Sequence, residues 1–370
     1  MGLPNYTPQV QVIGVRRRSS TPMDPTYPLV PILNIVSACL VLFSLLNRSI
    51  HHHWNIGVGL LGAWVFVEDL IGGIDSIVWA DNADDKSPIW CDISSHISVG
   101  FDVAVPARSL VITRRLFKIT RLRSVEPPSA LERRLEIATD LSLGLGIPVL
   151  TMGLFVNYIL QGARYQVIEE LGCGGAVLES GVSVILIFSW GVILPAISII
   201  FYCPGILWTF YRHTKQINRF LQTDSSLTRR RYFRVLALGL FDALVTLPLG
   251  AAIFTMDIRS TSHFVFYQGW DLIHTGWEPV VLKASQWKPA LWASVNVYYV
   301  HWRTIVLALG FFFLFGTTGE AREVYRRVFW ATVKALGIRR RERTTTGNLS
   351  IIVFEPPLEG ISKDDDVTTS

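Results

Sequence analysis

Seven long apolar segments recur along the sequence, and they limit what this chain can fold into. They cover residues 28–46, 56–80, 93–116, 137–160, 182–211, 235–256 and 297–315. A helix needs about 20 mostly apolar residues to cross the hydrocarbon layer of a membrane. The second and third segments are the weakest because both contain charged residues. We therefore expect an all-α membrane protein in which seven transmembrane helices form a bundle.

The composition supports a membrane protein and argues against several other classes. Of the 370 residues, 50% are hydrophobic and only 17% are charged, whereas soluble domains carry about 25% charged residues. The net charge of +5 is attributed to basic residues on one side of the membrane, so we expect no nucleic-acid partner. Four cysteines without a CxxC spacing indicate neither a disulfide scaffold nor a metal site. No Gly-rich phosphate loop, HExxH or GxSxG motif occurs, so we expect no cofactor and no enzymatic activity.

Lysine and arginine are concentrated in the connections after the third, fifth and seventh segments. Basic residues stay on the cytoplasmic side of a membrane protein. We therefore expect the C-terminus in the cytoplasm and the N-terminus outside. Three arginines at positions 16–18 run against this bias but are outnumbered.

The chain is expected to have four parts. Residues 1–27 form an extracellular segment with a glycosylation sequon at Asn5, and residues 28–316 form the seven-helix bundle. In residues 317–343, apolar positions at helical spacing stand among arginines, which favours an amphipathic helix on the inner leaflet, bound to anionic membrane lipids, over a plain cytoplasmic helix. Residues 344–370 are expected to be a disordered cytoplasmic tail.

Acidic side chains interrupt the second and third segments. A charge at a helix centre costs ~3 kcal/mol on insertion scales, while each Leu or Val returns only about 0.5 kcal/mol, so these groups should face the bundle interior or lie near its edge. Three roles are open: a ligand pocket, a proton path, or hydrogen bonds that fix helix contacts. Tryptophans in the long connection before the last segment either mark the membrane interface or form a lid over an amphipathic ligand. The expected ligand contacts are Glu68, Asp69, Asp75, Trp79, Asp102, Trp270 and Trp277.

Two of the cysteines lie on the outer side. Cys91 stands at the outer end of the third segment, and Cys173 lies in the connection between the fourth and fifth. Both face the oxidising side of the membrane, where disulfides persist. We expect a Cys91–Cys173 disulfide that ties this connection to the third helix, and the alternative is two free thiols.

Short motifs along the chain form an ordered pattern. The strongest is Trp-Cys-Asp-Ile-Ser-Ser at 90–95, followed by Arg-Arg-Leu at 114–116. Further matches are Gln161, Arg164-Tyr165, Gly172-Cys173, Arg-Tyr-Phe-Arg at 231–234, Phe315-Gly316, Glu320-Ala321 and Tyr325. Over residues 28–330 the combination resembles the fungal mating-pheromone receptors of the a-factor-receptor type, a branch of the G-protein-coupled receptors. Residues 47–55 match the family's first cytoplasmic loop only in part, which leaves a divergent or mating-independent paralogue open.

The resemblance implies a plasma-membrane receptor for a farnesylated peptide pheromone that activates the α subunit of a heterotrimeric G protein and a mating kinase cascade. We expect the G-protein contact at Arg114, Arg115, Arg229, Arg230 and Arg231. A basic patch suits an acidic partner, although such arginines also set topology. The main alternative is a proton-coupled transporter that uses the intramembrane carboxylates, and a structural membrane scaffold is the third hypothesis. The sequence leaves a homodimer open.

Overall fold

The structure is a computed structural model that describes most of the central part of the chain. The described residues are 26–50, 56–121, 129–153, 156–178, 180–209, 234–241, 244, 247–248, 250–252, 255, 265–317, 321–327 and 330. The chain divides into two units, Met1–Val324 and Tyr325–Ser370, and nearly all described residues lie in the first. Of the membrane-proximal helix expected over 317–343, residue 317 is described and lies in a turn, and residues 321–327 and 330 are described and helical.

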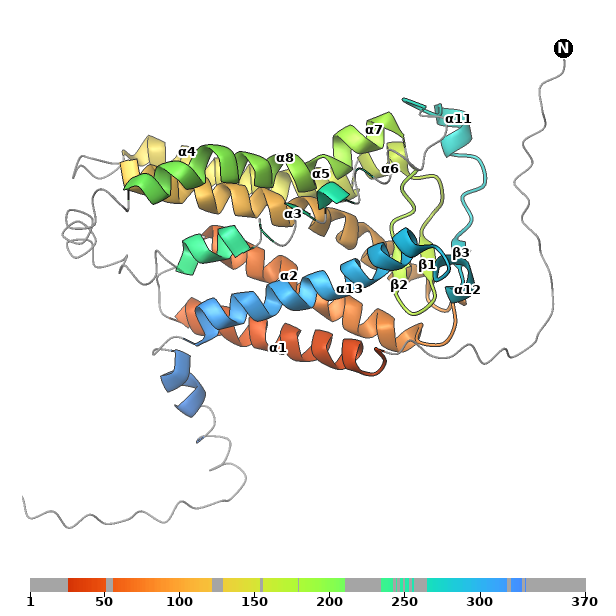
Figure 1. Ribbon diagram of the computed structural model, residues 1–370, viewed down its shortest axis with the longest axis horizontal. Coiled ribbons are helices and arrows are strands. Elements are labelled where there is room, and N and C mark those ends of the chain that lie inside the picture. Colours follow the sequence, from red (N-terminus) through yellow and green to blue (C-terminus); the bar gives the residue numbers. More distant parts are fainter. Residues whose placement is uncertain are drawn as a thin grey trace, which may run out of the picture. The chain divides into compact units, whose positions relative to one another are not determined.

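The first three predicted segments each form one continuous helix. They are α1 (Leu29–Ile50), α2 (Ile56–Val78) and α3 (Pro88–Arg121). Figure 1 shows them side by side with α13 (Leu291–Phe311), which forms the last segment together with a π-helical turn, η4 (Phe312–Gly316). The third helix begins five residues before the predicted segment, because the polar turns around Asp92 continue the helix beyond the apolar stretch.

The fourth segment is built from shorter pieces. Helix α4 (Ala130–Leu141) continues through a π-helical turn, η1 (Ser142–Gly146), into α5 (Ile147–Gly153), and α6 (Val156–Leu160) follows. The first turn of α4 is closed by a capping box, in which Ser129 and Glu132 each bond the backbone N–H of the other.

The fifth segment also contains π-helical turns. Its elements are α7 (Gly181–Ser183), η2 (Val184–Phe188), α8 (Trp190–Ile197) and η3 (Ser198–Tyr202), followed by helical residues 203–209. The sixth predicted segment, 235–256, is described at residues 235–241 and at several later positions, all of them helical.

A small sheet and two short helices gather at one end of the bundle (Figure 1). The strands β1 (Gln166–Ile168), β2 (Gly172–Gly174) and β3 (Val280–Leu282) pair in the order β2-β1-β3. In register, Val167 lies opposite Cys173 in the antiparallel pair and beside Val281 in the parallel pair. The short helices α11 (Trp270–Ile273) and α12 (Ala284–Trp287) lie on either side of β3 in sequence. This end carries the loops that the charge bias assigns to the outside.

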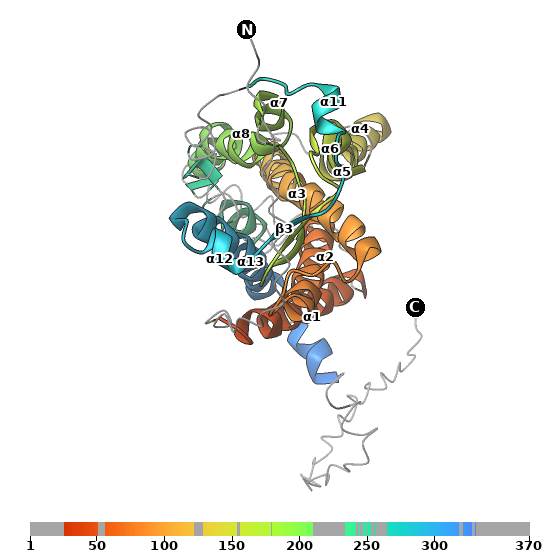
Figure 2. The same cartoon turned by 90° about the vertical axis from the view of Figure 1, so that its right-hand side faces the viewer.

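Within the described residues, five helices have the length and apolar composition needed to cross a membrane. They are Leu29–Leu46, Ile56–Val78, Ala130–Gly153, Trp190–Thr209 and Ala293–Gly316. Helix α3 is not among them, yet it packs against α2, α5, α8 and β2 and occupies the middle of the bundle in Figure 2. A central helix meets little lipid, so it tolerates polar residues that a lipid-facing helix does not.

Close helix contacts in the bundle depend on small residues. At Gly62 of α2, an added Cβ would lie 2.8 Å from Cζ of Phe311 and 2.9 Å from Cδ2 of Leu45. Glycine therefore allows α1 and α13 to approach α2 closely, as is common in membrane bundles. Phe311 belongs to the main apolar core with Val41, Leu61, Ile112 and Ile206.

Candidate ligand-binding site

Two adjoining cavities lie inside the bundle, next to the sheet. The larger has a volume of about 420 Å³ and is lined by α3, α13, η2 and both strands of the β1–β2 hairpin. The smaller has a volume of about 90 Å³ and reaches toward α1 and α2. The residues that line both cavities are Ser98, Asp102, Leu171, Gly174, Val300 and Arg303.

An ion pair stands between the two cavities. Nη2 of Arg303 in α13 donates to Oδ1 of Asp102 in α3 at 2.6 Å. The Arg303 guanidinium also lies over the rings of Phe101, at 5.0 Å, and Tyr299, at 5.5 Å, contacts that stabilise a cation through the ring quadrupole. The pair therefore joins α3 to α13 with a charged group open to both cavities.

Unsatisfied polar atoms lie beside this pair. Glu68 of α2 lines the smaller cavity and is 8% exposed. Its Oε2 and the Nε of Arg303 have no hydrogen-bond partner among the described residues. A buried polar atom without a partner costs free energy, so a polar ligand group that met these atoms would gain more than it would at a satisfied site.

Asp75 lines the smaller cavity, but its oxygens are held by the protein. It accepts hydrogen bonds from Nε1 of Trp90 at 2.6 Å and from the backbone N–H of Cys173 at 3.1 Å. Gly172, at φ +100°, leaves no room for a Cβ because that atom would overlap Asp75. Asp75 thus fastens the β1–β2 hairpin to α2.

Two other expected ligand contacts lie outside both cavities. Asp69 is fully buried and accepts a hydrogen bond from Ser37 of α1 at 2.9 Å, so it joins α1 to α2. Trp79 is fully buried and donates to the backbone oxygen of Asp84 at 2.8 Å. It packs with Tyr165; burial raises the pKa of Tyr165 to about 12, so its hydroxyl stays protonated beside Asp85.

A disulfide joins the expected cysteine pair. Cys91 in the first turn of α3 is bonded to Cys173 in β2, with the two Cα atoms 5.1 Å apart. The hairpin that borders both cavities is therefore linked covalently to α3 and by hydrogen bonds to α2.

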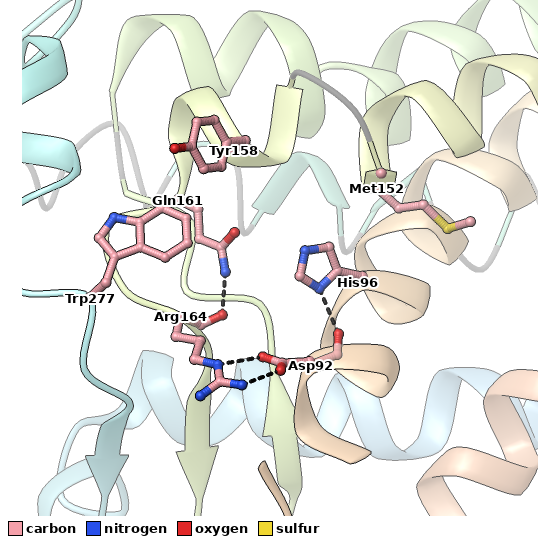
Figure 3. Close-up of a pocket in the computed structure, with 8 residues that line it drawn as sticks. Asp92, His96, Met152, Tyr158, Gln161, Arg164 and Trp277 are labelled. Atoms are coloured by element: carbon pink, nitrogen blue, oxygen red, sulfur yellow. Dashed lines mark hydrogen bonds and ion pairs between the residues drawn. The ribbon is translucent and has the colours of Figure 1, made fainter. Parts of the chain in front are cut away.

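The two remaining tryptophans lie elsewhere. Trp270 and Trp277 belong to an aromatic cluster with Tyr158 and His274. Trp277 lines a third pocket, between α3 and α6 (Figure 3). Neither tryptophan lines the two interior cavities.

The expected inner contact is described only in part. Arg114 and Arg115 lie in the last turns of α3, half-buried, and Nη1 of Arg115 is 3.8 Å from Oδ2 of Asp140 in α4. Arg229, Arg230 and Arg231 lie outside the described residues, as does Asn5.

Arg303 is the site residue that our sequence analysis missed. It stands within the last predicted segment, 297–315, where an ionisable residue is itself a signal of a functional site. Among the described residues, no group of three or more His, Cys, Asp or Glu side chains is arranged to hold a metal ion.

Comparison with known proteins identifies the family of this chain. The family model described as "Pheromone A receptor" (STE3) matches residues 29–336. The Pheromone B alpha 3 receptor of Schizophyllum commune (strain H4-8 / FGSC 9210) is 31% identical over 335 residues, with 87% of this chain and 50% of that protein covered. Pheromone receptor 1 of Ustilago hordei is 28% identical, with 86% of this chain and 89% of the relative covered. The Pheromone a factor receptor of Saccharomyces cerevisiae (strain ATCC 204508 / S288c) is 26% identical, with 79% and 61% covered.

Among solved structures, squid rhodopsin is similar at 12% identity and a TM-score of 0.47, with 83% of this chain and 85% of that chain covered. The chain spans about half the length of the Schizophyllum commune relatives that it matches. The family match covers most of the chain, including all of the described membrane-spanning helices. The chain therefore belongs to the STE3 pheromone A receptor family, a family of helical, multi-pass membrane proteins that act as receptors and not as enzymes.

Proposed function

We propose that this chain is a G-protein-coupled receptor of the plasma membrane for a lipidated peptide pheromone. It would cross the membrane seven times, with the N-terminus outside and the C-terminus in the cytoplasm. Ligand binding at the two interior cavities would favour a bundle conformation that promotes nucleotide exchange on a Gα subunit.

The Asp102–Arg303 pair is the observation that carries this proposal. It joins α3 to α13 between two cavities, so a ligand that bonds either partner competes with a contact between helices. A ligand shifts a conformational equilibrium only by its difference in affinity for the two states. Replacement of the internal ion pair by a ligand contact would supply such a difference in affinity between the two conformations.

The lipid group of the ligand would add affinity without a polar contact. Each buried methylene of a lipid chain contributes about 0.8 kcal/mol, so a farnesylated peptide would concentrate in the outer leaflet before it reaches the cavities. The peptide part would then supply the groups that meet Asp102, Arg303 and Glu68.

On the cytoplasmic side, the basic residues would form the surface for the Gα subunit. Arg114 and Arg115 lie at the end of α3, the helix that also carries Asp102. A shift of α3 would therefore move both the ligand site and the inner contact. The Arg115–Asp140 pair would open when an acidic group of the partner replaces Asp140.

The test is nucleotide exchange on a purified Gα subunit by receptor in lipid nanodiscs, with a panel of farnesylated peptides. We expect at least one peptide to accelerate exchange, and Arg303→Gln to abolish the acceleration. Lys283→Gln removes an exposed cation from the outer connection and should respond as the unchanged receptor does. If every peptide left the exchange rate at its peptide-free value, the proposal would be overturned in favour of a scaffold. Proton-driven solute flux in proteoliposomes that needs no Gα would overturn it in favour of a carrier.

A further inference from the structure

The third pocket lies apart from the proposed pheromone site. It has a volume of about 250 Å³ and shares no lining residue with the two interior cavities. Figure 3 shows its walls: Asp92 and His96 come from α3, Met152 from α5, Tyr158 from α6, and Trp277 from the connection between α11 and β3.

In the proposed orientation, this pocket lies at the level of the outer surface of the membrane. The membrane-spanning helix Ala130–Gly153 ends at the pocket, since Met152 and Gly153 are lining residues. Tyr158 is 47% exposed and Trp270, beside the pocket, is 51% exposed. Tyrosine and tryptophan are enriched at the level of the lipid headgroups, so the pocket opens where headgroups lie.

One side of the pocket carries a balanced pair of charges. Nε of Arg164 donates to Oδ1 of Asp92 at 2.9 Å, and Nη2 donates to Oδ2 at 2.5 Å. These bonds raise the pKa of Arg164, and they occupy two of the five N–H donors of a guanidinium. The pocket thus offers a cation with further donors and an anion next to it, with no net charge.

A histidine adds a hydrogen-bond acceptor. Nδ1 of His96 lies 2.6 Å from the backbone oxygen of Asp92. A carbonyl oxygen only accepts, so Nδ1 carries the proton, and in the neutral ring Nε2 is then an acceptor. In Figure 3 the Nε2 edge of the ring faces the pocket.

The opposite side is an aromatic wall. The ring centroid of Tyr158 lies 5.3 Å from that of Trp277 and 4.6 Å from that of His274. Nε1 of Trp277 donates to the backbone oxygen of Ile273 at 3.1 Å, so the polar atom of the indole is satisfied within the protein. Faces of tryptophan and tyrosine attract cations, and quaternary ammonium groups are bound by such walls.

We propose that this pocket binds the headgroup of a phosphocholine lipid from the outer leaflet. The phosphate accepts from the remaining Arg164 donors, and the trimethylammonium group lies against the aromatic wall of Tyr158 and Trp277. The acyl chains leave past Met152 toward the bilayer. A zwitterion matches a pocket of zero net charge. An anionic headgroup would bring a negative charge next to the Asp92 carboxylate and no positive group of its own.

The aromatic wall also favours choline over ethanolamine. Asp92 and Nε2 of His96 are acceptors in this pocket, but the N–H donors of a primary ammonium group that face the aromatic rings would find no acceptor to replace their water. A trimethylammonium group has no N–H donors, so it loses no hydrogen bonds when it leaves water.

The test uses purified full-length receptor and dihexanoyl-phosphocholine below its micelle concentration as the probe, with affinity taken from the ligand-dependent rise in thermal midpoint. We expect Trp277→Leu to weaken binding about tenfold, and Trp277→Phe, which keeps a ring face, to retain most of it. Trp190→Leu is the matched control, because Trp190 is also half-buried and its indole N–H also bonds a backbone oxygen, that of Leu186.

The head group series completes the experiment. Dihexanoyl lipids with phosphoglycerol or phosphoethanolamine heads should bind more weakly than phosphocholine. Tighter binding of phosphoglycerol would overturn the proposal, and so would equal phosphocholine affinity in Trp277→Leu and Trp190→Leu. Because the assay contains neither pheromone nor Gα, its outcome is independent of the proposed receptor activity.

Discussion

At the residue scale, the Asp102–Arg303 pair brings two costly charges together inside a membrane bundle. Each charge alone would be unfavourable there. The 2.6 Å hydrogen bond between the two side chains offsets that cost, and so do the two aromatic rings that lie against the guanidinium. Asp75, by contrast, accepts a hydrogen bond at each of its two oxygens, and Asp69 accepts one at Oδ2 from Ser37. Asp69, Asp75 and Asp102 look alike in the sequence but therefore have different surroundings.

A double-mutant cycle should reveal this coupling. We expect Asp102→Asn or Arg303→Gln alone to lower the free energy of unfolding by about 2 kcal/mol, less than for a fully buried pair because Asp102 is open to the cavity. In the double variant, the loss of unfolding free energy should be clearly smaller than the sum of the losses in the two single variants, as measured by thermal unfolding in nanodiscs. Strictly additive losses would show that the two charges do not stabilise each other.

At the scale of single elements, the π-helical turn η1 is explained by an arginine of another helix. Arg108 of α3 is fully buried and donates from Nε to the backbone oxygen of Gly144 and from Nη1 to that of Asp140, both at 3.0 Å. Nε1 of Trp64 donates to the same Gly144 oxygen at 3.3 Å. A π-helical turn carries an extra residue and departs from the i→i+4 pattern, so its carbonyls can meet donors from α2 and α3.

Gly144 is therefore expected to tolerate no side chain. A Cβ at this position would overlap the Arg108 guanidinium, so Gly144→Ala should lower the thermal midpoint of the receptor by several degrees. Gly153→Ala is the control in the same segment, because an added Cβ there meets no atom within 4 Å. Equal midpoints for the two variants would contradict this account of the turn.

The β1–β2 hairpin is the second element with a clear physical basis. It is held by the disulfide between Cys91 and Cys173 and by Asp75, and it borders both cavities. Its position thus depends on α2 and α3 together, not on the three residues of each strand.

Removal of the disulfide should affect stability and ligand affinity together. For the double variant Cys91→Ser and Cys173→Ser we expect a loss of about 3 kcal/mol in the free energy of unfolding and weaker binding of an activating peptide. Cys39→Ser, at an exposed free cysteine, should change neither quantity in thermal unfolding and peptide-binding assays. Unchanged peptide affinity in the double variant would place the ligand away from the hairpin.

At the scale of the whole molecule, the charge distribution predicts the orientation in the membrane. Basic residues cluster in the connections after alternate segments, and the sheet, the disulfide and the interior cavities gather at the opposite end of the bundle. The proposed ligand side and the proposed signalling side are thereby separated by the length of α3.

Epitope accessibility tests this orientation directly. An epitope placed after Ser370 should be labelled only after the cells are permeabilised, because the basic connections stay in the cytoplasm. Glycosidase treatment should shift the mobility of the protein, and Asn5→Gln should abolish that shift. Labelling of the C-terminal epitope on intact cells would reverse the proposed orientation.

Much of the architecture could be predicted because the information is local. Hydropathy depends on each segment alone, so the first, second and seventh apolar runs correspond to α1, α2 and α13 within a few residues, and the outer cysteines were expected as a pair. The π-helical turns were not foreseen, because donors such as Arg108 come from a different helix.

The sequence by itself determined the helical membrane class and the family, since apolar length and short motifs are read along the chain. Only the tertiary structure decided which charged groups share a cavity. Arg303 lies 201 positions from Asp102, and no local pattern connects them. The roles of Asp75 and Trp79, which contact the hairpin, were also decided by the tertiary structure. Their partners come from elements that meet only when the bundle is packed.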